Sequence, residues 1–288
     1  MKAVQNVITL DKTRGKISGL MTISYIVCIG ICIIVFTPLL ITVFAAFKAP
    51  AQLGLDFPLM PPRQVFLENF AKVFRDGNLI VSFKNSFFLA GMSVIFNAFM
   101  GSMAAYCLNR FDFRLKKLIL GLFFLGMLIP AYVTEIARFG IIKNLGLYNT
   151  IFAPIIIYAA TDLLQIYIFL QFIQKIPLSL DESAMLDGCT YFGIFWRIIF
   201  PLLLPATATL AIIKAVDVLN DMYIPYLYMP GSKLRTMTTM LMAYSSSMYG
   251  SWSFLSAAIL IIMMPTLLIY LIFQKYIFSG IVAGAIKE

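Results

Sequence analysis

The chain has 288 residues, of which 61% are hydrophobic and 12% are charged, and its mean hydropathy is +0.92. A chain this apolar has too few polar side chains to cover a water-soluble globule, so the composition excludes a soluble protein and indicates an integral membrane protein. The formal net charge is +9. In a membrane protein, basic side chains belong at the ends of spanning segments beside anionic lipid, so this charge does not indicate nucleic-acid binding.

Six apolar segments are long enough to cross a membrane, since a transmembrane helix needs about 20 apolar residues. The sequence therefore predicts an all-α membrane protein with six transmembrane helices. The expected spans are about 17–47, 85–109, 118–137, 151–173, 198–224 and 254–274. The first segment is too long for the apolar core of a signal peptide, and no small-residue cleavage site follows it, so we expect it to remain as a span.

Lysine and arginine set the expected orientation, because they concentrate in short cytoplasmic segments. They are frequent in residues 1–16 and in the link 110–117, which follows the second span. Both segments should therefore face the cytoplasm. An even number of spans then places the tail, 276–288, on the same side, with the transmembrane permease region 17–275 in between.

The long segment after the first span should lie outside the cell. The prolines at positions 58, 61 and 62 exclude a continuous helix there. A short amphipathic helix is expected to follow, with one apolar face formed by Phe66, Phe70, Val73 and Phe74. Two roles are open for this helix: anchoring at the membrane surface and contact with a partner protein.

The four cysteines lie in apolar runs or beside a glycine. Cys28 and Cys32 are one helical turn apart, but the sequence contains no histidine, and Cys107 and Cys189 stand alone. We therefore expect all four to serve packing, with no metal site and no redox chemistry.

The link between the fourth and fifth spans predicts two short helices. Ser179 with Glu182 three residues later has the spacing of a capping box, which marks the start of a helix. Gly188 is placed to turn the chain through a left-handed conformation and end that helix. Thr190 can cap a second helix, which should run to Pro201 and then merge into the fifth span. An ordinary cytosolic loop with common caps is the alternative.

The same link, "DESAMLDGCTYFGIFWRIIFP", resembles the cytoplasmic "EAA" loop of ABC-importer membrane subunits. That loop has Glu-Ala-Ala, three residues, Gly, nine residues, Ile, one residue and Leu-Pro. Five positions agree, namely Glu182, Ala184, Gly188, Ile198 and Pro201. Ser183 and Phe200 stand where the family has alanine and leucine, and they keep the small size and the apolar character of those positions.

Outside the loop, the chain resembles the MalG-like permease subunit of carbohydrate ABC importers over nearly its whole length. The matching stretches are "AYCLNRFDFRLKKL", "KNLGLYNT", "DVLND" and "IFQKYIFSGIVAGAIKE". One departure is that Leu219 precedes Asn220, where the family commonly has tryptophan.

The resemblance implies a type I ABC importer permease fold with a cytoplasmic coupling helix, formed by the first helix of the loop 177–201. The residues expected to couple the chain to the ATPase are Glu182, Ser183, Ala184, Asp187, Gly188, Ile198 and Pro201. Closure of two ATPase subunits would move this loop and switch the spans between inward-open and outward-open states.

The resemblance also implies the partners of the chain. They are two ATP-binding cassette subunits, a second homologous permease, an extracytoplasmic solute-binding protein, a carbohydrate substrate and the lipid of a bacterial or archaeal inner membrane. No Gly-x4-Gly-Lys-Ser/Thr sequence occurs in the chain, and this is the motif that cradles ATP phosphates. We therefore expect a transport subunit that is not an enzyme and binds no cofactor, with ATP and Mg held by the partner ATPases.

Charged side chains late in the fifth span are candidates for the substrate pathway, because ionisable groups within a membrane usually face a cavity or a partner. Lys214, Asp217 and Asp221 follow each other at helical spacing. Asn220 and Tyr223 beside them would supply hydrogen bonds and an aromatic surface to a sugar. The alternative is an ion pair between Lys214 and Asp217 that holds helices together.

Three smaller features have two interpretations each. Asp162, in the fourth span, is expected to make a hydrogen bond between helices rather than line the pathway. The polar segment 228–253 resembles the loop that meets the binding protein in this family, or it is a plain surface connection. Gly280 and Gly284 have the spacing of a helix-pairing motif, but a flexible tail reaching toward the ATPases is preferred because they lie beyond the last span.

Two other classes of protein compete with an importer subunit. A secondary transporter should show inverted internal repeats, and we find none in the sequence. A membrane scaffold or assembly factor would explain the spans but not the ionisable side chains of the fifth span.

Overall fold

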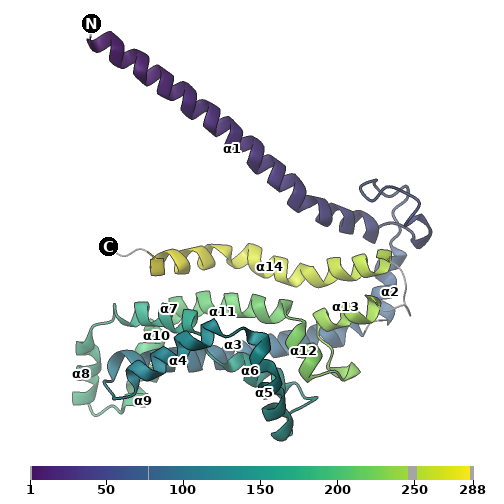
Figure 1. Ribbon diagram of the computed structural model, residues 1–288. Helices are drawn as coiled ribbons and strands as arrows, with labels where there is room; N and C mark the ends of the chain where they lie inside the picture. Colours follow the sequence, from purple (N-terminus) through teal and green to yellow (C-terminus); the bar gives the residue numbers. More distant parts are fainter. Residues whose placement is uncertain (1, 77, 246–251, 286–288) are drawn as a thin grey trace. The chain divides into compact units, whose positions relative to one another are not determined.

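The computed structural model describes residues 2–76, 78–245 and 252–285, and over these residues its regular elements are all helices (Figure 1). The all-α prediction is confirmed. Three helical segments are long and apolar enough to cross a membrane: Met21–Ala46, Leu79–Arg110 and Trp252–Lys275. Three bent helix pairs also qualify, so up to six crossings are possible by length and composition among the described residues, which is the number expected.

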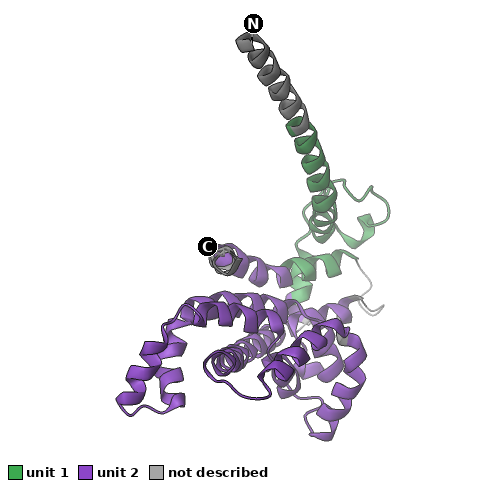
Figure 2. Cartoon of the chain, turned by 60° about the vertical axis from the view of Figure 1, so that its left-hand side comes forward, with its two compact units in different colours: residues 1–73, 247–260 green, residues 74–246, 261–288 purple. Residues whose placement is uncertain are grey.

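The chain divides into two compact units, coloured separately in Figure 2. The first comprises residues 1–73 and 247–260, and the second comprises residues 74–246 and 261–288. The long helix α14 (Trp252–Ala285) contributes to both units.

In the first unit, α1 (Lys2–Ala46) begins well before position 17, the expected start of the span. A 3-10 turn, η1 (Pro50–Gln52), and the helix α2 (Glu68–Asp76) follow, and residues 74–76 of α2 already belong to the second unit. The amide of Asn69 on α2 donates to the carbonyl oxygens of Ala46 and Lys48, at 2.8 and 2.9 Å. These bonds satisfy carbonyl groups that the end of a helix leaves without partners.

The amphipathic helix expected after the prolines is present as α2, but its predicted apolar face is only partly right. Val73 is fully buried, whereas Phe74 is 60% exposed. Phe66 precedes the helix, and its backbone N–H donates to the carbonyl of Phe47 at 2.9 Å. The Phe70 ring packs against that of Phe47 at a tilt of 41°, with ring centroids 5.0 Å apart, so Phe70 serves packing within the unit.

In the second unit, α3 (Leu79–Arg110) is the central helix and packs against four others. These are α6 (Phe152–Ala159), α7 (Leu163–Ile173), α11 (Leu204–Asn220) and α13 (Met237–Ser245). Two apolar clusters form along α3, one around Leu89 near its beginning and one around Tyr106 near its end.

The remaining elements of the second unit are short. They are α4 (Lys116–Leu128), α5 (Ala131–Asn144), α8 (Leu178–Leu186), α9 (Tyr191–Ile194), a π-helical turn (Phe195–Ile199), α10 (Phe200–Leu202), α12 (Tyr223–Tyr228) and the 3-10 turn η3 (Ser232–Leu234).

Three of the expected spans are each built from two helices rather than one. The segment expected at 118–137 bends by 112° between α4 and α5, and the one at 151–173 bends by 51° between α6 and α7. The segment expected at 198–224 bends by 76° before α11 and its helix ends at Asn220. Pro201 and Pro205 explain this last break, because neither has the N–H that continues a helical hydrogen-bond ladder.

The break between α6 and α7 is stabilised by Asn97 of α3. Its amide nitrogen donates to the carbonyl oxygens of Tyr158 and Ala160, at 3.2 and 2.9 Å. Within a membrane, carbonyl groups freed by a helix break need such partners, because lipid offers none. On the other side of the break, Asp162 accepts from the backbone N–H of Gln165 at 2.8 Å and so caps α7. The expectation that Asp162 links two helices is therefore wrong.

The end of the chain also differs from expectation. The backbone of α14 is helical to Ala285, so residues 276–285 continue the last helix. Residues 286–288, and residues 246–251 of the polar segment 228–253, lie outside the described residues.

Candidate functional site

The first helix of the loop 177–201 is present as α8, but it begins two residues earlier than the sequence predicts. Its N-cap residue is Pro177, which makes no side-chain capping bond. Ser179 therefore already lies inside the first turn, and the predicted capping box with Glu182 is not formed. The extended backbone of Pro177, with φ −59° and ψ 138°, starts the helix instead.

The turn that ends α8 has the conformation predicted for Gly188. Its φ is +80°, a left-handed conformation that favours glycine. The backbone N–H of Gly188 donates to the carbonyl of Met185 at 3.0 Å, and that of Cys189 donates to the carbonyl of Ala184 at 2.9 Å. These two bonds form a Schellman motif, which fixes the direction in which the chain leaves the helix.

The second helix of the loop starts where the sequence predicts. Thr190 is its N-cap, and its hydroxyl oxygen accepts from the backbone N–H of Gly193 at 3.2 Å. The helix continues through the π-helical turn to Leu202, one residue past Pro201. Ile198 is half-buried against the apolar cluster around Tyr106, whereas Pro201 is exposed.

The side chains of α8 separate into an outer and an inner set. Glu182, Ser183 and Asp187 are exposed, as is Leu186 at 90%. Ala184 is buried in the apolar cluster around Tyr106. The two small side chains of this loop, Ser183 and Ala184, therefore differ in exposure, since Ser183 is exposed and Ala184 is buried.

Asp181 is the residue of this loop whose role the sequence did not reveal. It is 1% exposed, and its carboxylate lies 3.1 Å from Nη2 of Arg110 at the end of α3. The hydroxyl of Tyr106 donates to Oδ1 of Asp181 at 3.2 Å, and Nη2 of Arg110 also donates to the carbonyl of Ile176 at 2.8 Å. The three-residue spacing of Asp181 and Ala184 is a signal that both share the inner face.

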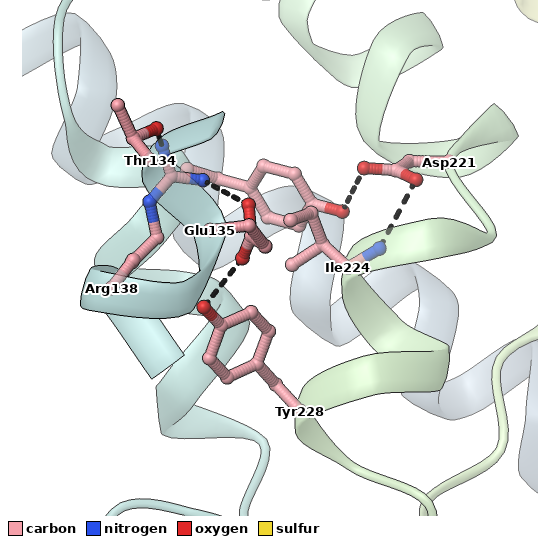
Figure 3. Close-up of polar contacts among 7 residues, drawn as sticks. Thr134, Glu135, Arg138, Asp221, Ile224 and Tyr228 are labelled. Carbon is pink, nitrogen blue, oxygen red and sulfur yellow. Dashed lines mark hydrogen bonds and ion pairs between the residues drawn. The ribbon is translucent and has the colours of Figure 1, made fainter. Parts of the chain in front are cut away.

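A second polar cluster lies where α5, α6 and α12 meet (Figure 3). Glu135 on α5 is 5% exposed, accepts a hydrogen bond from the Tyr228 hydroxyl, and pairs with Nη1 of Arg138 at 3.0 Å. Burial of the Tyr228 hydroxyl, and then its hydrogen bond to Glu135, raise the pKa of Tyr228, so this group remains a donor. This cluster was not predicted from the sequence, although Glu135 within the third expected span was a signal for it.

Asp221 belongs to the same region but not to the face expected for it. Since α11 ends at Asn220, the backbone of Asp221 is extended. Its carboxylate accepts from the backbone N–H groups of Tyr223 and Ile224, at 2.7 and 3.3 Å, and from the Tyr158 hydroxyl at 2.7 Å. Figure 3 shows this carboxylate pointing at the start of α12. Asp221 therefore joins α6 to the start of α12.

The other pathway candidates are more accessible. Asp217, Asn220 and Tyr223 are exposed, and Lys214 is half-buried with Nζ 5.8 Å from the centre of the Tyr158 ring. Among the described residues the ion pairs within 4.0 Å do not include Lys214 with Asp217. A cation–π contact with Tyr158 holds Lys214 instead.

A pocket of about 630 Å³ lies beside the break of the fourth expected span. Its size is within the range of small-molecule sites. The lining residues from α4 are apolar, and Arg138, Thr161 and Asp162 add polar groups. The lining residues are Ile119, Leu122, Phe123, Gly126, Met127, Arg138, Thr161, Asp162 and Leu163.

Membrane-length helices, a two-helix loop with an exposed outer face, and ionisable side chains along a broken span together indicate a membrane permease. The chain belongs to the family of binding-protein-dependent transport system inner membrane components, whose model matches residues 97–282. It is therefore a transport component of an inner membrane rather than an enzyme, and the resemblance stated from its sequence is confirmed.

The relatives agree with this family. The chain is 32% identical over 251 residues to the probable ABC transporter permease protein YurM of Bacillus subtilis, covering 87% of this chain and 83% of that protein. It is 30% identical over 254 residues to the melibiose/raffinose/stachyose import permease protein MelC of the same organism, covering 88% and 91%. A bacterial ABC transporter that imports the acidic polysaccharide alginate has the same fold, with a TM-score of 0.75, 19% identity and coverage of 89% and 96%.

Proposed function

We propose that this chain is one of two permeases in an ATP-driven importer of a sugar or oligosaccharide, which a solute-binding protein delivers from outside. The family name supports the binding protein, and the name of MelC supports the class of substrate. The other partners are a second, homologous permease and two ATP-binding cassette subunits. ATP and Mg bind to those subunits, and this chain binds no cofactor.

The observation that supports coupling to an ATPase most directly is the outer face of α8. Glu182, Ser183 and Asp187 are exposed beside Leu186, while the inner face is fixed by Asp181 and Ala184. An apolar side chain surrounded by polar groups on a rigid helix is typical of a docking surface. Glu182 and Asp187 supply charges that pair with basic groups in a groove of the ATPase.

The orientation follows from this role. The loop 177–201 and both chain termini face the cytoplasm, where ATP is available. The segment 228–253 then lies outside and meets the binding protein.

The substrate path runs along the exposed side chains of α11 and the neighbouring polar groups. Asp217, Asn220 and Tyr223 are the accessible candidates, and Lys214 is half-buried against the Tyr158 ring. Carboxylate and amide groups next to an aromatic ring match the hydroxyl groups and apolar faces of a sugar.

The test is purification of this chain from its native membranes with the proteins bound to it, followed by ATPase assays. Binding proteins are added empty or loaded from a panel that includes melibiose, raffinose, stachyose and an alginate oligosaccharide. We expect an ATP-binding subunit and a second permease to co-purify, and one carbohydrate to raise hydrolysis. Purification of the chain alone, or hydrolysis that no loaded binding protein changes, would contradict the proposal.

A matched pair of variants locates the docking surface. Glu182→Lys reverses a charge on the outer face of α8, so we expect normal membrane insertion with loss of the ATPase subunit and of uptake. Asp112→Asn removes an exposed charge in another link, where it pairs only with Lys116 at 3.4 Å, and should leave both unchanged. Retention of the ATPase and of uptake in Glu182→Lys would place the docking surface elsewhere.

A further inference from the structure

We propose that α3 is a rigid connection between two parts of the chain. It transmits movement of the coupling helix α8, which contacts the C-terminal end of α3, directly to the segment 232–237, which contacts the N-terminal end of α3. The inference rests on the proposed function, because it assigns to α3 the task of linking the ATPase side to the binding-protein side. It identifies Arg110, Asp181 and Asn85 as positioning residues.

At one end, α3 contacts both helices of the coupling loop. Asp181 of α8 is held between Arg110, at 3.1 Å, and Tyr106, at 3.2 Å. The Tyr106 ring also packs on Phe195 of the second helix, with ring centroids 5.6 Å apart. Because the Arg110 and Asp181 side chains are only 10% and 2% exposed, water cannot easily replace these contacts. A displacement of α8 therefore displaces the end of α3.

At the other end, α3 holds the segment that follows α12. The amide of Asn85 donates to the carbonyl oxygens of Lys233 and Arg235, at 2.9 and 3.0 Å. The backbone N–H of Met237 donates to the hydroxyl oxygen of Ser86 at 2.9 Å. These three bonds bind α3 to η3 and to the first residue of α13, a segment within the proposed contact with the binding protein.

Between these two ends, α3 is one uninterrupted helix of 32 residues without a proline. The 25 residue steps from Asn85 to Arg110 span about 38 Å, at 1.5 Å per residue. This exceeds the roughly 30 Å hydrocarbon core of a bilayer. By contrast, the segments expected as the third, fourth and fifth spans are each broken into two helices. Over the described residues, α3 thus contacts the coupling loop with an unbroken backbone that is long enough to cross a membrane.

The experiment measures ATP hydrolysis by the complete transporter in nanodiscs, with and without its binding protein. The binding protein is loaded with whichever sugar of the panel above gives the highest hydrolysis by the wild type. Asp181→Asn loosens one end of the connection and Asn85→Ala loosens the other. Asp112→Asn and Asn144→Ala are the matched controls, since both replace exposed side chains of the second unit. Co-purified ATPase subunit per permease measures assembly for each variant.

We expect both end variants to lower the ratio of stimulated to basal hydrolysis about five-fold or more, the lower range of coupling between sites. The double variant should be no worse than the more severe single one, because a connection broken at one end transmits nothing from the other. Asp181→Glu, which keeps the charge, should recover part of the ratio. A residue with a merely structural role would change the yield of complex but not this ratio.

Asn85→Ala keeps the inference testable if Asp181→Asn does not assemble, because Asn85 is at the opposite end of α3 from the coupling loop. A wild-type ratio in an assembled Asn85→Ala complex would overturn the rigid connection while the proposed function stands. Absence of stimulation in the wild type itself would remove the proposed function, and the inference with it.

Discussion

Gln165 of α7 donates from its side-chain nitrogen to Oδ1 of Asn97 on α3, at 2.7 Å. Asn97 in turn donates to both carbonyl groups at the end of α6. A Cβ atom on Gly101 would lie 2.6 Å from the Gln165 side chain, so the glycine permits this close approach of α3 and α7. One asparagine thus joins three helices at the break of the fourth expected span.

The first prediction concerns this junction. Asn97→Ala should lower the free energy of unfolding by about 1–3 kcal/mol, because the carbonyl groups of Tyr158 and Ala160 lose their donor and that of Tyr158 is buried. Thermal unfolding of the purified protein in detergent measures the change. Asn144→Ala, which replaces an exposed asparagine, should stay within about 0.5 kcal/mol of the wild type. Equal effects of the two variants would contradict the prediction.

The second prediction concerns the turn after α8. Gly188→Val should reduce sugar uptake strongly, because a branched side chain at φ +80° is strained and the Schellman turn directs the coupling loop. Gly188→Asn should retain most of the uptake, since asparagine tolerates this conformation and no atom lies within 4 Å of a Cβ there. Uptake is measured with labelled sugar in vesicles, normalised to the amount of assembled complex. Equal uptake by the Gly188→Val and Gly188→Asn variants would show that transport does not depend on the left-handed conformation of this turn.

The third prediction concerns Glu135. Tyr228→Phe removes the hydroxyl that donates to this buried carboxylate and leaves it with Arg138 alone. A hydrogen bond to a charged group contributes about 1.5–3 kcal/mol, so the midpoint of thermal unfolding should fall measurably. Tyr226→Phe, on the same helix but 54% exposed, is the control. The hypothesis fails if the melting curve of Tyr228→Phe superimposes on that of the control.

The fourth prediction separates a residue of the substrate path from a residue of the scaffold. Asp217 is exposed, so Asp217→Asn should reduce uptake while the free energy of unfolding stays within about 0.5 kcal/mol. Asp221→Ala should instead destabilise the protein by about 1–3 kcal/mol, because it leaves the Tyr158 hydroxyl and two backbone N–H groups without their acceptor. Uptake assays and thermal unfolding of both variants test the two expected effects. The opposite outcome would exchange the two roles.

The sequence by itself determined the features that depend on local rules. Six apolar segments follow from composition over about 20 residues, and Gly188 and Thr190 follow from the backbone conformations that end and begin helices. The family was recognisable for the same reason, because its loop is a set of fixed spacings along the chain. Each of these features involves residues a few positions apart, so no knowledge of the neighbouring helices was needed.

Tertiary structure decided which side of each helix faces a neighbour. Asp181 and Glu182 are adjacent acids, yet only the packing of α8 on α3 determines that Asp181 is buried beside Arg110 and Glu182 is exposed. Asn97 could not be assigned from sequence either, because its partner Ala160 is 63 residues away. A broken apolar span is possible only where another helix satisfies the freed backbone groups, and the sequence does not state which helix that is.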